Sequence, residues 1–496
     1  MNAIVDVPAR GRGLAALLGL LFPLAFAPFH VYPLGLVLPA LLFLLWEGQT
    51  RREAALRSFV FGFAAFAVGT YWLYISIRGF GGAPIPVVIL LMFSGFLLQG
   101  LYLALAGLIA ASLPTASRTL RWCFVWPAVF TFVDWLRNWL FFGFPWLTLG
   151  YGQIDGPLRA WAPVAGVHGI TLVALVLSGA GLTLALGKRD DRIIAGVVVA
   201  LLGVATLALY DRDWTEPAGD ELRVSLVQGS VPQDRKWLRE QLRPTLQLYR
   251  DLTLAEAGSD LVIWPEVAVP SLARRVRSYL DEIDAEARRR GLQIYLGILT
   301  LDDASGQYRN SLIGLGPSRA EYHKRHLVPF GEFFPVPDFA RAWMRSAGLP
   351  NQDTLPGAWD QPPLPVGRYL MAPGICYEDT FGTEQLDFLP AAQLLINVSN
   401  DAWFGDSIAP HQHLQMARMR SLEAGRPMLR ATNTGITAII GPDGRIVDEL
   451  EQFATDVLRA KVEPRTGATP YVRTGNWPVI VVCALLIGLG GILRPK

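Results

Sequence analysis

Long apolar segments constrain the fold of this chain more than any other feature of its sequence. A helix that crosses the hydrocarbon core of a bilayer needs about 20 mostly apolar residues, and it must satisfy its backbone hydrogen bonds internally. Apolar stretches of roughly this kind recur through the first 210 residues and once more near the end. We therefore expect about eight spanning helices, at 13–28, 33–46, 58–77, 86–112, 122–141, 165–186, 193–209 and 477–493.

The charged residues are distributed very unevenly along the chain. Only 20 of the 86 Asp, Glu, Lys and Arg residues fall before position 211, and most of the others lie between 211 and 476. That charge-rich stretch has the length of one large soluble domain. We expect seven membrane helices in 1–212, a soluble domain in 213–474, and a final helix with a short tail in 475–496. The net charge of +2 gives no reason to expect nucleic acid as a partner.

Lys and Arg in the short loops predict the orientation of the spans, because such residues concentrate on the cytoplasmic side. Twelve of them lie before the first span, after every second span and at the C-terminal end, whereas the alternate loops carry only Arg78 and Arg159. Both termini are then cytoplasmic and the soluble domain lies outside. Ala25-Phe26-Ala27 resembles a signal-peptide cleavage site. Pro28 directly after it disfavours cleavage, so we treat this segment as a span.

Few charges fall inside the expected spans. Asp134 and Arg137 share one face of a helix, which favours a paired structural role. A transporter with a sensor domain is disfavoured, because it would need more intramembrane charges. The outer loop 138–160 is rich in Trp, Phe and Tyr, as in an interfacial aromatic belt. An alternative is that Phe144 to Trp146 and Tyr151 line an entry for lipid.

The soluble domain reads as short buried strands alternating with amphipathic helices. This pattern predicts a layered sheet-and-helix domain, whose chemistry sits at the ends of buried strands. Strands are expected at 222–229, 260–266, 292–300, 310–316, 368–379 and 393–401, helices at 243–257, 278–291 and 413–426, and a hairpin turn at Pro442 to Gly444. Residues 320–330 carry the chain into a loop.

Three reactive side chains stand at the ends of these strands. Cys376, in GICYED, is the soluble domain's lone cysteine, since Cys123 and Cys483 lie in apolar segments. Glu266 ends the apolar run LVIWPE, and Lys324 lies in YHKRHLVPFGEF. Taken singly, each has an ordinary structural explanation: a small core residue, an ion-paired carboxylate, or part of a solvated basic face. Together they are the thiol, carboxylate and amine needed to make and break an acyl-thioester.

The order WPE, HKRHLVPFGE, GICYE resembles the nitrilase superfamily, which implies an αββα sandwich and a Glu-Lys-Cys triad. Longer strings resemble the apolipoprotein N-acyltransferase family over nearly the whole chain. They are GFPWLTLGYGQIDGP, QGSVPQDRKW, NDAWFGDSIAPHQHLQMARMRSLEAGRPMLRATNTGIT and TPYVRTGNWP. The resemblance implies a bacterial inner-membrane enzyme whose catalytic domain is periplasmic, without metal or cofactor.

The reaction that the resemblance implies moves a fatty acyl chain from the sn-1 ester of a phospholipid to the N-terminal amine of a diacylglyceryl-cysteine lipoprotein. Cys376 would be the nucleophile, Glu266 the general base and acid, and Lys324, with the backbone N–H of Tyr377, the oxyanion stabiliser. Glu332 would orient Lys324 or the incoming amine, and Tyr377 and Glu378 would shape the nucleophile turn. A membrane-tethered amidase, which would finish with water, uses the same three residues and is the alternative.

A lipid substrate also requires apolar contacts. The segment 333–350 is rich in apolar side chains and is interpreted as a mobile lid that touches the bilayer, with a core-packed helix as the alternative. Trp237 is a candidate for the acyl pocket or for the core. The expected lipid contacts are Trp146, Trp237, Phe333, Phe334, Trp343 and Met344.

Overall fold

The computed structural model describes residues 7–113, 115, 117–256, 258–346 and 353–493. The chain forms two compact units. The helical unit comprises Met1–Tyr74, Ile85–Asp213 and Thr469–Lys496, and the sheet unit comprises Ile75–Pro84 and Trp214–Ala468. The short segment 75–84, whose first three residues were expected in the third span at 58–77, therefore belongs to the sheet unit.

Every predicted span overlaps a helix of the helical unit, with ends that differ by up to several residues. These helices are α2 (Pro8–Leu21), α3 (Leu34–Trp46), α4 (Arg51–Gly69), α5 (Ile85–Ser112), α7 (Trp126–Arg137), α8 (Ala162–Leu186), α9 (Arg189–Tyr210) and α15 (Trp477–Ile492). Among the described residues, three helical stretches are long and apolar enough to cross a membrane: Ile85–Ser112, Pro157–Leu186 and Arg189–Tyr210. Helices α3 and α15 are apolar but shorter. The number of eight spans stays a prediction.

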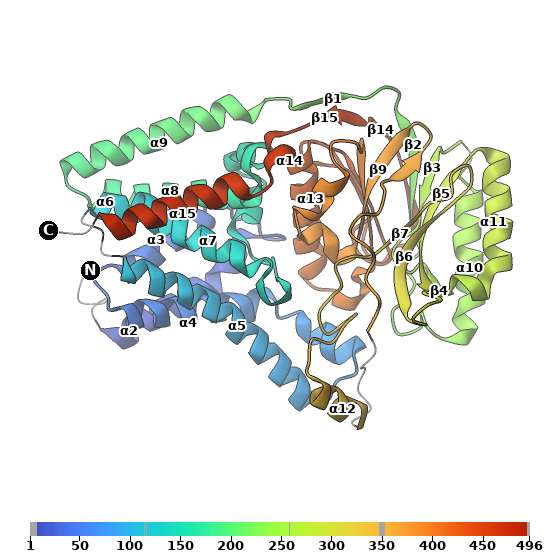
Figure 1. Cartoon of the computed structure of the whole chain (residues 1–496), viewed down its shortest axis with the longest axis horizontal. Helices are drawn as coiled ribbons and strands as arrows, with labels where there is room; N and C mark the ends of the chain where they lie inside the picture. The colour runs from blue at the N-terminus through green and yellow to red at the C-terminus, as the bar shows by residue number, and fades with distance from the viewer. Residues whose placement is uncertain (1–6, 114, 116, 257, 347–352, 494–496) are drawn as a thin grey trace. The chain divides into compact units, whose positions relative to one another are not determined.

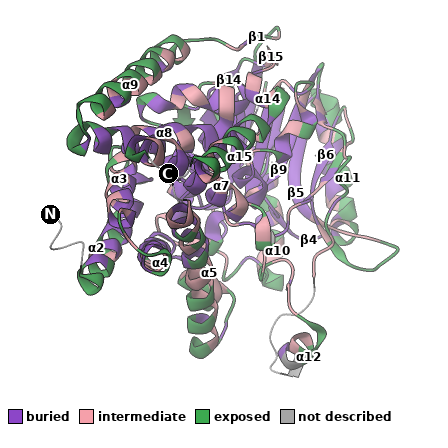
Figure 2. Cartoon of the chain, turned by 60° about the vertical axis from the view of Figure 1, so that its left-hand side comes forward, coloured by how far each residue is buried: buried purple, intermediate pink, exposed green. Residues whose placement is uncertain are grey.

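Local signals explain where some of these helices begin and how they face their surroundings. Helix α4 begins at Arg51, earlier than the predicted 58, because the Thr50 side chain accepts a hydrogen bond from the Glu53 backbone N–H. Helix α9 is exposed along most of its length (Figure 2). Its exposed side chains include Leu201, Val204 and Leu207, and an apolar exposed surface of this kind suits contact with lipid.

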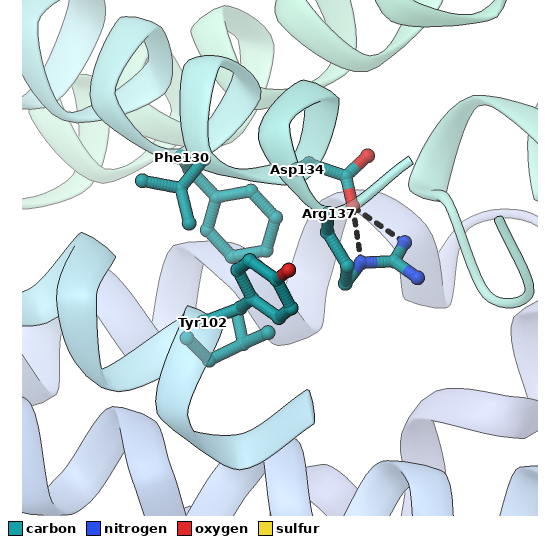
Figure 3. Close-up of a pocket in the computed structure, with 6 residues that line it drawn as sticks. Tyr102, Phe130, Asp134 and Arg137 are labelled. Atoms are coloured by element: carbon teal, nitrogen blue, oxygen red, sulfur yellow. Dashed lines mark hydrogen bonds and ion pairs between the residues drawn. The ribbon is translucent and has the colours of Figure 1, made fainter. Parts of the chain in front are cut away.

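Asp134 and Arg137 form the buried ion pair that the sequence predicts, with Arg137 Nη2 2.6 Å from Asp134 Oδ1. They line a small pocket together with Tyr102 and Phe130 (Figure 3). Arg137 also donates to the carbonyl oxygen of Trp146 at 2.8 Å. Its guanidinium therefore holds the aromatic segment that follows α7 while its charge is balanced by Asp134.

The sheet unit is an αββα sandwich, as predicted (Figure 1). One sheet has the order β13-β12-β11-β10-β9-β8, and the other has the order β14-β2-β3-β5-β6-β7 with β4 paired to β5. Helix α13 (Ala409–Ala424) covers the first sheet, and α10 (Arg239–Leu254) and α11 (Arg277–Arg290) cover the second. The Tyr295 hydroxyl donates to the carbonyl oxygen of Pro365 at 2.6 Å and so links the two sheets.

The predicted strands and helices of this unit are confirmed, with ends that differ by a few residues. The strands are β2 (Leu222–Gln228), β3 (Leu261–Ile263), β5 (Gln293–Leu301), β6 (Tyr308–Leu315), β9 (Tyr369–Ile375) and β10 (Leu394–Ser399). Residues 320–330, predicted only to carry the chain into a loop, also contain a short strand, β7 (Glu321–His323). Helices α11 and α13 end at Gly291 and Gly425, which both take a positive φ. The buried apolar runs form the strands, and the amphipathic stretches supply the covering helices.

The C-terminal part of the sheet unit is more elaborate than the predicted hairpin. The turn at 442–444 joins β12 (Ala438–Ile440) to β13 (Ile446–Glu449), and β12 also pairs antiparallel with β11 (Met428–Thr432). Strand β14 (Asp456–Val462) then crosses to the other sheet, where it pairs antiparallel with β2. Strands β4 (Val269–Leu272), β8 (Leu364–Val366) and β1 (Thr215–Pro217) with β15 (Arg465–Gly467) were not predicted, because each is short.

Candidate active site

The three reactive residues each follow a strand of the sandwich. Glu266 follows β3, Lys324 follows β7 and Cys376 follows β9. The Lys324 ammonium lies 3.4 Å from Glu266 Oε1. Both charges act on the Cys376 thiol, where the carboxylate raises its pKa and the ammonium lowers it. The two facing sheets therefore bring the Cys376 turn together with Glu266 and Lys324, which precede it in the sequence by 110 and 52 residues.

Glu266 is held by hydrogen bonds to both of its carboxylate oxygens. Oε1 accepts from Asn310 Nδ2 at 2.7 Å, and Oε2 accepts from the backbone N–H of Asn400 at 2.9 Å. The next residue, Val267, takes a φ of 45°, which is unfavourable for a β-branched side chain. The buried carboxylate is thus fixed in direction, and a strained turn next to it is often part of a functional site.

Lys324 is buried and paired with two carboxylates, those of Glu332 and Glu266. Its side chain is 1% exposed, and Nζ lies 2.8 Å from Glu332 Oε2. Burial lowers the pKa of Lys324, but the nearby carboxylates of Glu332 and Glu266 raise it more, so it stands well above its ordinary value. The side chain therefore remains an ammonium, which suits it to stabilise negative charge on a reacting oxygen.

Cys376 begins a tight turn, η8 (Cys376–Thr380), with a φ of 52°. A positive φ at a non-glycine residue presents its side chain at a sharp strand-to-turn junction, and this conformation is costly. Unlike Cys123 and Cys483, which are fully buried, Cys376 is partly exposed. Burial and then the Glu266 carboxylate raise the pKa of the thiol well above its ordinary value, against the opposing effect of Lys324. The resting sulfur therefore carries a proton, and its attack requires a base.

Glu378 connects the turn that carries Cys376 to the loop that carries Lys324. One oxygen accepts from the backbone N–H of Ile375 at 2.7 Å. The other accepts from the backbone N–H groups of Arg325 at 2.6 Å and His326 at 3.2 Å, and from the Tyr322 hydroxyl at 2.9 Å. Burial and the neighbouring Glu384 raise the pKa of Glu378 to about 7. Its predicted role in shaping the turn is consistent with these bonds.

Tyr377 and Glu332 also lie beside the triad. Tyr377 is buried, and its ring packs edge-on against His326 at 5.6 Å between centroids. Glu332 accepts from the backbone N–H of Val328 at 2.9 Å and from Asn310 Nδ2 at 3.1 Å, in addition to Lys324. Glu332 is therefore positioned to orient the ammonium of Lys324.

Sequence reasoning missed several polar residues around the triad. Asn310 on β6 and Asn400 after β10 hold the Glu266 carboxylate, and Lys236 Nζ lies 3.4 Å from the Glu266 carbonyl oxygen. Burial lowers the pKa of Lys236 to about 8. Asn310 lies on β6 and Asn400 directly follows β10, and only the packing of these strands shows that both residues reach the site. A lone lysine in QDRKW carries no signal of burial.

The structure distributes the expected lipid-contact residues over different environments. Trp237 is 53% exposed, so it is not the core tryptophan that the sequence favours. Trp146 is 2% exposed, and its ring stacks on Phe144 at 5.1 Å inside the helical unit. This burial leaves Trp146 little surface for lipid.

The expected lid contains helix α12 (Asp338–Ser346) and the residues before it. Phe334 and Met344 are buried, Phe333 is half-buried, and Phe339 is 78% exposed. The Trp343 side chain and residues 347–350 lie outside the described residues. The exposed Phe339 is the side chain of this segment best placed to meet an apolar partner.

Comparisons with known proteins match both parts of the chain. Residues 18–180 match the apolipoprotein N-acyltransferase N-terminal domain, and residues 223–471 match the carbon–nitrogen hydrolase domain. The apolipoprotein N-acyltransferase of Methylococcus capsulatus is 43% identical over 479 residues, which cover 95% of this chain and 94% of that protein. The Azotobacter vinelandii protein of the same name is 42% identical over 492 residues, covering 96% and 94%.

A carbon–nitrogen hydrolase from Helicobacter pylori G27 aligns in three dimensions with 56% of this chain and 95% of its own. The TM-score is 0.39 and the sequence identity is 14%. The similarity is too low to compare the two sites residue by residue. The full-length relatives are therefore the comparison that bears on activity.

Proposed function

Because this chain belongs to the apolipoprotein N-acyltransferase family, a family of acyltransferases of the carbon–nitrogen hydrolase superfamily, we propose that it N-acylates lipoproteins through a Cys376 thioester. The acyl donor is a phospholipid, and the acceptor is the N-terminal amine of a diacylglyceryl-modified cysteine. One observation carries the proposal. The Glu266 carboxylate and Lys324 ammonium, 3.4 Å apart, both act on a thiol that a positive-φ turn presents at a strand end.

In the first half-reaction Glu266 takes the proton of the Cys376 thiol, which its raised pKa otherwise keeps in place. The sulfur attacks the sn-1 ester carbonyl, and Lys324 stabilises the negative charge that develops on the carbonyl oxygen. The ester C–O bond then breaks, and the departing glycerol oxygen takes the proton from Glu266. The products are a lysophospholipid and the acyl-thioester.

In the second half-reaction the amine of the lipoprotein attacks the thioester carbonyl. Glu266 receives a proton from the amine nitrogen and passes it to the sulfur as the C–S bond breaks. An amide forms and the free thiol returns. Because Glu332 Oε2 lies 2.8 Å from Lys324 Nζ, Glu332 is the candidate for holding the ammonium in place through both steps.

The reaction requires an arrangement in which lipid reaches the site and water does not, because water would hydrolyse the thioester. We place the helical unit in the bacterial inner membrane, the sheet unit on the periplasmic side, and both termini in the cytoplasm. The support is the bias of Lys and Arg in the loops, together with exposed apolar side chains on α9. Segment 333–346 would act as the lid.

The experiment that tests this function supplies phospholipid and a short peptide that begins with diacylglyceryl-cysteine. We expect an N-acylated peptide and one lysophospholipid for each peptide modified. A membrane-tethered amidase would instead release free fatty acid and leave the peptide amine unmodified. Cys376→Ser should abolish the product of either the transferase or the amidase reaction. This variant therefore tests the nucleophile but does not tell the two acceptors, amine and water, apart.

A further inference from the structure

Next to the nucleophile turn, a network of four charged side chains lies fully buried in the sheet unit. Asp379 belongs to η8, Asp401 to η10 (Asp401–Phe404), His413 to α13 and Arg430 to β11. Their side chains are 0–1% exposed. Burying four charges is costly unless each is paired and hydrogen-bonded. Because burying these charges is costly, the network is a candidate for a specific role.

His413 and Arg430 each bridge the two aspartates of this network. His413 Nε2 lies 2.7 Å from Asp379 Oδ1, and His413 Nδ1 lies 2.9 Å from Asp401 Oδ1. Asp379 and Asp401 raise the pKa of His413 to about 9 against the effect of burial, so near neutral pH the ring is an imidazolium that can donate to both carboxylates. Arg430 Nη2 also lies 3.0 Å from His413 Nδ1. Arg430 completes a second bridge, at 2.8 Å to Asp379 Oδ2 and 3.0 Å to Asp401 Oδ2. Two cations thus balance two carboxylates.

This network is connected to Cys376 by two routes. Asp379 lies three residues after Cys376 in the same turn. Arg430 also donates to Asn397 Oδ1 at 2.8 Å, while Asn397 Nδ2 donates to the Cys376 carbonyl oxygen at 3.3 Å. A displaced Arg430 or Asp379 would therefore move the backbone that sets the direction of the thiol.

The same network is connected to Glu266. Asp401 is adjacent to Asn400, whose backbone N–H donates to Glu266 Oε2 at 2.9 Å. Asp401 also accepts from the Ser399 hydroxyl at 2.8 Å, which fixes the start of this turn. The carboxylate pair Asp379 and Asp401 is thus tied at one end to the nucleophile and at the other end to the base.

We propose that His413 and Arg430 are positioning residues, which clamp Asp379 and Asp401 together and so hold the Cys376 thiol in line with the Glu266 carboxylate. The inference rests on the proposed function, since it assigns these residues to the thioester-forming step. They touch no substrate, and they act through the backbone of Cys376 and Asn400. Their loss should lower the rate of acylation without changing affinity for lipid.

The test uses the full-length protein in detergent with phospholipid, with acyl-enzyme followed by rapid quench and mass spectrometry. His413→Gln removes the clamp's charge, and Asn397→Ser removes the link to the Cys376 carbonyl without changing any charge. We expect the acylation rate constant to fall at least tenfold in both, with the half-saturating lipid concentration changed less than twofold. A merely structural role would reduce the amplitude of acyl-enzyme and leave the rate constant unchanged.

Asp284→Asn is the matched control, because Asp284 is a buried carboxylate on α11 whose bonds in the described part of the chain go to Gly316, Arg288 and Arg319 and not to the triad. The acylation rate constant of Asp284→Asn should equal that of the unmodified protein. If His413→Gln does not fold, Asn397→Ser alone tests the inference. An acylation rate constant of Asn397→Ser within twofold of that of the unmodified protein would then overturn it.

Alkylation by iodoacetamide separates this inference from the proposed function, because it needs no lipid. Cys376 is the partly exposed cysteine, whereas Cys123 and Cys483 are buried. We expect Cys376 to be alkylated at least fivefold more slowly in both variants. Equal alkylation rates would overturn the positioning role. Normal alkylation of the unmodified protein without any acyl adduct would overturn the proposed function alone.

Discussion

Lys324 and Glu332 form a buried ion pair, with Nζ 2.8 Å from Oε2 and the lysine side chain 1% exposed. The same ammonium lies 3.4 Å from Glu266 Oε1, and Asn310 Nδ2 donates to both carboxylates. One cation therefore holds two acids together beside the thiol.

Lys324→Met should leave those two carboxylates buried and unbalanced. We expect the free energy of unfolding to fall by about 3–5 kcal/mol at pH 7.5, because breaking a buried pair strands the remaining charge. Part of the loss should be recovered at pH 5, where one carboxyl can take up a proton. Thermal unfolding at both pH values measures this. Lys461→Met, at an exposed position, should have almost no effect, and an equal loss in both variants would contradict the account.

Glu378 should give the protein a stability that decreases as pH rises through the weakly acidic range. The pKa of Glu378 is raised to about 7 in the folded protein, from 4.5. Between these values the folded state binds more protons than the unfolded state, so stability falls as pH rises from 4.5 to 7, by up to about 3 kcal/mol. In Glu378→Gln this slope should be absent. Thermal unfolding from pH 4.5 to 8 checks it, and an unchanged slope would contradict the assignment.

His413 should produce a loss of stability at higher pH. The pKa of His413 is raised from 6.5 to about 9, because the effect of Asp379 and Asp401 outweighs that of burial. Its contribution is complete below pH 6.5 and disappears as pH rises through 9, a change of up to about 3 kcal/mol. His413→Gln should be less stable at pH 6.5 and should lose little more up to pH 9.5. If the stability of His413→Gln falls between pH 6.5 and 9.5 as steeply as that of the unmodified protein, His413 is not the imidazolium that we infer.

Phe339 offers a test of the lid. Phe339→Ser should slow acylation by phospholipid about tenfold and spare acylation by a small soluble thioester, because only the lipid has to pass an apolar gate. Val447→Ser, which alters another exposed apolar side chain on β13, should change neither rate. Equal losses with both donors in Phe339→Ser would remove the lid from the mechanism.

The sequence predicts the layers of the sheet unit and the three reactive positions, because buried strands leave continuous apolar runs and reactive side chains interrupt them. It could not predict the partners of those side chains. Asn310 and Asn400 reach Glu266, and His413 reaches Asp379, only through the packing of strands and helices that lie far apart in sequence. The partners of Arg430 could not be predicted either, since a charged residue within a strand gives no sign that two aspartates contact it.

Boundaries and environments were the least predictable features. Helix α4 begins seven residues before the predicted span because the Thr50 cap, not the apolar run, sets its start. Trp237 is half exposed although a tryptophan in a soluble domain is usually buried, and Trp146 is buried although it lies in an aromatic loop. The Thr50 cap is a local contact, whereas the environments of the two tryptophans depend on tertiary packing that local composition does not encode.

The most direct test of the whole account is peptide mass spectrometry of the purified protein after incubation with phospholipid alone. We predict one fatty acyl group on the peptide that contains Cys376, released by hydroxylamine and absent from Cys376→Ser. Glu266→Gln should form this adduct at least a hundredfold more slowly, because the thiol then keeps its proton. An unmodified Cys376, or an acyl group that persists in Cys376→Ser at another residue, would contradict the mechanism.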